Sequence, residues 1–124
     1  MKFALTIVVP VFNEAENLLR VEEALSDYIK IASVPTEILF VNDGSKDNSQ
    51  ELIETICENN TAFHFIQFEE NRGLSAAIKA GFDYTTTNLV GYIDADLQTN
   101  PEDFNLLLEH IEEYDLVTGV RANR

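Results

Sequence analysis

The sequence is short of positive charge and of cysteine. It carries 8 Lys and Arg against 22 Asp and Glu in 124 residues, so the formal net charge is −14. Nucleic acids and anionic membrane surfaces are held by basic surfaces, so this stretch offers neither of them a direct contact. Its one cysteine, Cys57, excludes an internal disulfide and favours a reducing compartment, which indicates the cytoplasm.

Long hydrophobic runs are also lacking. The longest one, from Phe3 to Phe12, is interrupted by Thr6 and Pro10, whereas a membrane-spanning helix needs about 20 apolar residues. The run leads directly into Asn13 without the small-residue cleavage site of a signal peptide. No transmembrane segment or signal peptide is therefore predicted in this stretch.

What is present is the composition of one globular domain, with 45% hydrophobic residues and a regular alternation of strand and helix patterns. Asn13, with Glu16 three residues on, predicts the N-cap of the first helix, and Asp47 that of the second. Asn100 and Pro101 are typical of the start of a fourth. Strands are predicted over residues 3–9, 37–41, 62–67, 89–93 and 114–120. This order predicts an α/β, Rossmann-like fold, with a mainly parallel sheet and helices on both faces.

Acidic and amide residues follow several of these strands, at the edge where ligands bind in such sheets. Asp94 and Asp96 lie two apart after the fourth strand, and Gln98 continues the same phase. Two carboxylates on one side of an extended segment, with a neutral oxygen beside them, suit a divalent cation. The alternative is that they cap a turn, because the whole chain is acidic.

The loops after the first three strands also hold polar candidates, each with a structural alternative. Asp43 could accept hydrogen bonds from a base or ribose, or only build the turn that its neighbours predict. Glu14 also suits a helix N-terminus. Arg72 could meet a phosphate or lie solvated. The sequence has no G-x-G-x-x-G after the first strand, no P-loop and no G-x-S-x-G, which excludes the common dinucleotide, P-loop and hydrolase motifs.

Taken together, the strand ends resemble a family 2 glycosyltransferase of GT-A fold. The segment from Ile7 to Glu14, IVVPVFNE, is similar to the family's opening strand and loop, and VNDGS from Val41 to its V-x-D-G-S segment. NRGLSAA from Asn71 resembles its N-x-G-x-x-x-A helix start, and Asp94-Ala95-Asp96 its D-x-D. Asn42 departs from the second Asp of many members. The run DADLQ, with later PE and GVR, is similar to the polyprenyl-phosphate branch, which includes dolichyl-phosphate mannose synthase.

The resemblance implies a role for each strand end. The nucleoside pocket of the donor would be framed by Pro10, Phe12 and Glu14, and Asp43 would contact the base or ribose. Arg121 would approach the phosphates. The metal, Mg²⁺ or Mn²⁺, would lie on the donor diphosphate and be held by Asp94, Asp96 and Gln98. The sugar would pass with inversion from a nucleoside-diphosphate sugar to a polyprenyl phosphate.

Members of this family continue well past residue 124. Residues 1–124 are therefore expected to be the nucleotide-diphospho-sugar-binding domain of a longer enzyme at the cytoplasmic face of a membrane. The acceptor side and its catalytic residues would lie beyond this stretch, so the stretch alone is expected to transfer no sugar and to self-associate through uncovered apolar surface. Two alternatives stay open, namely a nucleotide-binding module without catalysis and a receiver-like signalling domain. A receiver would need an acidic pair where Asn13-Glu14 stands and a Lys in place of Arg121.

Overall fold

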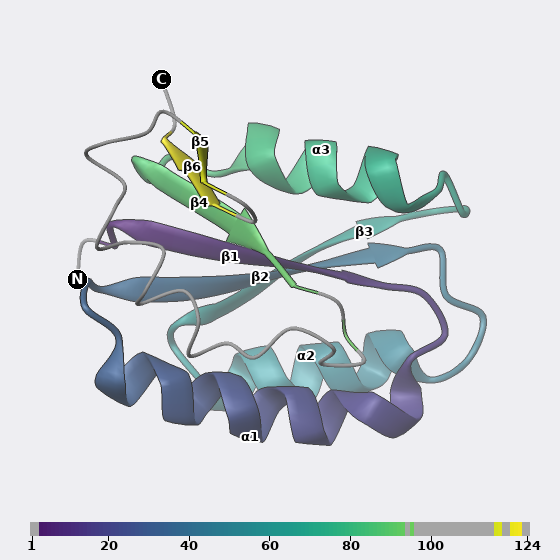
Figure 1. Ribbon diagram of the computed structural model, residues 1–124. Coiled ribbons are helices and arrows are strands. Elements are labelled where there is room, and N and C mark those ends of the chain that lie inside the picture. Colours follow the sequence, from purple (N-terminus) through teal and green to yellow (C-terminus); the bar gives the residue numbers. More distant parts are fainter. Residues whose placement is uncertain (1–2, 94, 96–115, 118–119, 123–124) are drawn as a thin grey trace.

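The computed structural model describes residues 3–93, 95, 116–117 and 120–122 (Figure 1). Strands and helices alternate through most of this part, as the hydrophobic periods predict. The predicted helix that starts at Pro101 lies outside the described residues. In chain order the elements are β1 Leu5–Val11, α1 Ala15–Ile31, β2 Thr36–Asp43, α2 Ser49–Asn59, β3 Phe63–Phe68, α3 Leu74–Tyr84, β4 Leu89–Tyr92, β5 Leu116–Val117 and β6 Val120–Ala122.

The strands form one sheet in the order β3-β2-β1-β4-β6-β5. The first four of these pair in parallel, with Ile7 beside Ile38 on one side and beside Gly91 on the other. The prediction of one strand over 114–120 is wrong, because β5 and β6 are two short antiparallel strands and β6 pairs antiparallel with β4. The mainly parallel sheet is confirmed, and the order of its strands reverses direction between β1 and β4.

Helices cover both faces of this sheet, as predicted. Figure 1 shows α1 and α2 beneath the sheet and α3 above it. The larger core cluster joins alternate residues of β1 to α1 and α2, and the smaller one joins Val8 to Ala77 of α3. Gly81 lets α3 approach closely, since a Cβ there would lie 2.5 Å from Val8 Cγ1. A strand buried on both faces is nearly all apolar, which explains the sequence of β1, where Thr6 is the one polar residue.

The predicted N-cap at Asn13 is wrong, and Asp47 lies one residue before the N-cap of α2. Helix α1 follows Glu14 and α2 follows Asn48, and neither of these residues makes a side-chain capping bond. Asn13 Oδ1 accepts from Lys46 N in the other loop, where a distant N–H donor competes with local capping. Asp47 does both, because its Oδ1 accepts from Ser49 N of its own helix at 3.0 Å and its Oδ2 accepts from Ala15 N. None of the helices in the described part is long and apolar enough to cross a membrane.

Cys57 lies half-buried on α2 and packs against the larger core cluster. Burial raises the pKa of its thiol to about 11. Because the thiolate is the nucleophile, we expect iodoacetamide at pH 8.5 to alkylate the native chain about a hundredfold more slowly than the urea-unfolded chain. The native rate should rise as the pH approaches 11. Equal rates for native and unfolded chains at pH 8.5 would contradict the buried thiol.

Candidate functional site

A cavity of about 400 Å³ opens at the carboxyl ends of the parallel strands. Its lining comes from the ends of β1 and β2 and from Ala95 after β4, and the strand order reverses between β1 and β4, which is the usual place for a ligand in an open α/β sheet. Both ends of the β1–α1 loop contribute to its wall, as does the start of α3. The described residues that line it are Pro10, Val11, Phe12, Glu14, Asp43, Asn71, Gly73, Leu74 and Ala95.

Asp43 is the most constrained side chain of this cavity. It ends β2, it is 3% exposed, and its carboxylate accepts hydrogen bonds from the loop before α3. Oδ1 accepts from Arg72 N at 2.7 Å, and Oδ2 accepts from Asn71 Nδ2 and Gly73 N, both at 3.0 Å. Bonds to an ionised acceptor are shorter and stronger than neutral ones. Asp43 therefore joins β2 to the start of α3 and closes one side of the cavity.

Gly44 makes this junction possible. Its φ is +70°, and a Cβ there would lie 2.4 Å from both Asn71 N and Glu70 C. Only glycine lets the backbone pass so close in a left-handed conformation. Asn42, where many family 2 members have Asp, is buried and accepts from Ser45 N at 3.0 Å, while its amide donates to Gln50 Oε1 at 2.8 Å. Asn42 thus stabilises the turn and does not line the cavity.

The loops after β1 and β2 are bonded to each other. Asn13 N donates to Ser45 Oγ at 2.9 Å, Glu14 N to Ser49 Oγ at 3.1 Å, and Ala15 N to Asp47 Oδ2 at 3.3 Å. Desolvation acts to raise the pKa of the Asp47 carboxyl, but hydrogen bonds from Ser49 and Ala15 outweigh it and hold that pKa below its ordinary value. The carboxylate therefore stays an acceptor at neutral pH. These bonds hold the Glu14 wall of the cavity against the loop that follows Asp43.

The structure brings together four of the predicted donor-binding residues. Pro10, Phe12, Glu14 and Asp43 line the same cavity, and Phe12 presents a ring that is 44% exposed. The predicted metal ligands Asp94, Asp96 and Gln98 lie outside the described residues, although Ala95, between the first two, is buried in the cavity wall. The backbone of Arg121 lies in β6, beside Val90 of β4.

Sequence reasoning missed the part played by Asn71 and Gly73. Both line the cavity and both donate to Asp43, from 28 and 30 residues away. Their signal was the N-x-G pattern itself, since Gly73 has a positive φ of 100° and the successive N–H groups of Arg72 and Gly73 both donate to the Asp43 carboxylate. Arg72 stacks its guanidinium 4.8 Å from the centre of the Phe68 ring, and it is not among the described lining residues.

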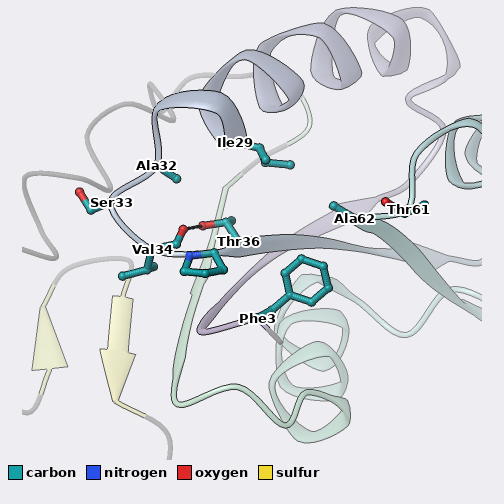
Figure 2. Close-up of a pocket in the computed structure, with 9 residues that line it drawn as sticks. Phe3, Ile29, Ala32, Ser33, Val34, Thr36, Thr61 and Ala62 are labelled. Atoms are coloured by element: carbon teal, nitrogen blue, oxygen red, sulfur yellow. Dashed lines mark hydrogen bonds between the residues drawn. The ribbon is translucent and has the colours of Figure 1, made fainter. Parts of the chain in front are cut away.

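A larger cavity, of about 760 Å³, lies at the opposite edge of the sheet, where β2 begins (Figure 2). Phe3, Ile29 and Val34 give it an apolar wall, and the Thr36 hydroxyl donates to Val34 O at 2.9 Å. None of the described residues that line it carries a charge. Size alone would favour this cavity, but a specific ligand site also needs a few convergent polar groups, and the smaller cavity supplies Glu14, Asp43 and Asn71.

Comparison with known proteins agrees with this geometry. Residues 6–124 match the family described as glycosyl transferase family 2. The chain belongs to that family. Among curated members it is 43% identical, over 122 residues, to the undecaprenyl-phosphate 4-deoxy-4-formamido-L-arabinose transferase of Yersinia enterocolitica, and 42% identical to that of Yersinia pestis strain Pestoides F. Each alignment covers 96% of this chain and 37% of the relative, so the chain spans little more than a third of their length.

Solved structures place this family 2 chain in the GT-A fold. The mannosyltransferase PcManGT from Pyrobaculum calidifontis, solved in complex with GDP-Man and Mn²⁺, superposes with a TM-score of 0.63 at 27% identity. That match covers 77% of this chain and 28% of PcManGT. TarS from S. aureus (residues 1–349) superposes with a TM-score of 0.67 at 21% identity, over 91% of this chain and 33% of TarS. The second likeness supports the fold alone.

Proposed function

We propose that this chain is the donor-binding part of a glycosyltransferase that moves a sugar from a nucleoside diphosphate to a polyprenyl phosphate. The observation that carries the proposal is the cavity in which Pro10, Phe12, Glu14 and Asp43 meet. A half-exposed aromatic ring and a fixed carboxylate at the switch point suit a base and its ribose. The names of the curated relatives support a polyprenyl-phosphate acceptor, and the rest of such an enzyme would supply the acceptor site at the cytoplasmic face of a membrane.

The chemistry proposed is a single displacement with inversion. An oxygen of the acceptor phosphate forms a bond to the anomeric carbon while the bond from that carbon to the nucleoside diphosphate breaks. The electron pair of the broken bond leaves with the diphosphate. Residues of the described part bind and orient the donor in this scheme. Phe12 would cover the base, and the carboxylate of Asp43 would keep its side of the cavity in place.

A divalent cation fits the donor set that follows β4. Asp94, Asp96 and Gln98 offer carboxylate and amide oxygens, the ligands preferred by Mg²⁺ and Mn²⁺. Their neighbour Ala95 lines the cavity, which supports a position beside the donor. The Mn²⁺ named with GDP-Man in PcManGT supports the same proposal. When bound, such a cation stabilises negative charge on the leaving diphosphate, and it would let a chain of net charge −14 hold an anionic donor.

Calorimetry with UDP and GDP, each with and without Mn²⁺, tests this function. We expect Asp96→Ala to abolish the Mn²⁺-dependent binding of the nucleotide, because a cation that loses a carboxylate ligand no longer bridges protein and diphosphate. Asp27→Ala, which removes an exposed carboxylate of α1, is the matched control and should bind as the parent does. Unchanged binding by Asp96→Ala would refute the metal role. Phosphorylation of an Asp by acetyl phosphate would favour the receiver-like alternative instead.

A further inference from the structure

Asn13 adopts an unusual backbone conformation between two residues of the cavity wall. It is the one non-glycine residue with a positive φ, 54°, in the part of the chain that the structure describes. Phe12 and Glu14 on either side both line the cavity, whereas Asn13 does not. Left-handed backbone is costly for a residue with a side chain, although Asn tolerates it better than most. A strained residue that persists beside a site is a reason to ask what holds it there.

The hydrogen bonds of Asn13 supply the answer. Its Oδ1 accepts from Lys46 N at 2.8 Å and, more weakly, from Asp47 N at 3.4 Å, while its own N–H donates to Ser45 Oγ at 2.9 Å. Asn13 therefore exchanges bonds in both directions with residues 45–47. Residues 45–47 begin two positions after Asp43, which lines the cavity, and Gly44 is the residue between Asp43 and Ser45.

We propose that Asn13 is a positioning residue for the nucleoside, an inference that rests on the proposed function. Asn13 takes its left-handed conformation between Phe12 and Glu14, and both of these neighbours line the same cavity. Bonds to residues 45–47 then hold this segment at a set distance from Asp43. The cavity wall is ordered before the ligand arrives, so less conformational entropy is lost on binding.

A purely structural role for Asn13 would give a different result. If Asn13 only stabilised the loop, its replacement would lower the stability of the chain and leave ligand affinity unchanged. Asn60, at the far end of α2, provides the comparison, because its amide donates to Ile56 O at 2.8 Å and to Glu22 Oε2 at 2.9 Å. It makes as many side-chain bonds as Asn13 and lies away from the described cavity lining.

The test compares Asn13→Gly, Asn13→Asp and Asn60→Gly by calorimetry with uridine, guanosine, UDP and GDP, alongside their unfolding midpoints. Asn13→Gly keeps the positive φ and removes the acceptor, and we expect it to weaken binding of the nucleoside that the parent prefers about 3- to 10-fold. Asn13→Asp keeps an acceptor oxygen and should restore most of the affinity for the uncharged nucleoside. Asn60→Gly should lower the midpoint and leave affinity as in the parent.

The positioning role of Asn13 and the proposed donor binding fail on different outcomes. If the parent binds a nucleotide and Asn13→Gly binds it equally well, the positioning role is overturned and the proposed function stands. An equal loss of affinity in Asn60→Gly would also overturn the positioning role, since the effect would then follow stability alone. If the parent binds none of the ligands with Mn²⁺ present, the proposed function fails and this inference fails with it.

Discussion

Replacing Gly44 with alanine is expected to destabilise the chain by about 2–5 kcal/mol, the combined cost of left-handed backbone and of overpacking. The added Cβ would lie 2.4 Å from Asn71 N and from Glu70 C, which are backbone atoms and do not move aside as a flexible side chain would. Urea denaturation followed by circular dichroism measures the loss. Because Asn71 would be displaced from Asp43, nucleotide binding should fall as well.

Gly73 supplies the control for this prediction. Its φ is +100°, so an alanine there is also strained, but no described atom lies within 4 Å of the added Cβ. Gly73→Ala should therefore cost only the backbone strain, about 1–3 kcal/mol, because its φ of 100° and ψ of 161° lie in a region almost restricted to glycine. The difference between the two variants measures the close approach of the two loops. Equal losses for Gly44→Ala and Gly73→Ala would show that the contact between Gly44 and Glu70–Asn71 contributes nothing.

The elements that the sequence predicts best are those with one strong local signal. Strand β1 is a largely apolar run, and Leu18, Val21 and Leu25 recur at helical spacing and are fully buried in α1. Hydrophobic burial determines both elements, and the spacing of the apolar residues along the sequence reveals it. The cavity followed from the same reasoning, because the carboxyl ends of parallel strands share one edge. That reasoning predicts Glu14 and Asp43, whereas Pro10 and Phe12 come from the resemblance to family 2, and all four line the cavity.

What the sequence could not predict depends on partners far along the chain. Asn13 has the pattern of an N-cap, yet its side chain bonds to Lys46 N, 33 residues away. Asp43 was expected to face a base or ribose, and its carboxylate accepts from residues about 30 positions later. The antiparallel pairing of Val117 with Val120 was likewise hidden, because residues 114–120 have the pattern of one strand. At Asn13 local propensity favoured one conformation and tertiary hydrogen bonding selected another.

Loss of the Asp43 carboxylate is expected to weaken the binding of free nucleosides as well as of nucleotides. Asp43→Ala leaves Arg72 N and Gly73 N without their acceptor, and leaves Asn71 Nδ2 with only its longer bond to Asp43 O at 3.3 Å, so the loop before α3 is held less firmly to β2. A lost hydrogen bond to a charged group costs about 1.5–3 kcal/mol, so nucleoside and nucleotide affinity should fall by at least tenfold. Calorimetry with uridine, guanosine and their diphosphates measures it. Stability should fall in parallel, because buried donors are left unpaired.

Two further variants separate the effect of the Asp43 hydrogen bonds from the effect of losing one negative charge. Asp83→Ala removes an exposed carboxylate at the end of α3, paired with Lys79 at 2.7 Å, and changes the net charge by the same amount. It should bind nucleosides as the parent does, since exposed ion pairs contribute little. Asp43→Asn keeps the shape but turns an amide N–H₂ toward loop donors, so it should recover only part of the affinity. A loss in Asp43→Ala confined to diphosphates, with free nucleosides unaffected, would assign Asp43 to the phosphate side of the donor. Unchanged stability in Asp43→Ala would instead show that the loop before α3 is held without the carboxylate.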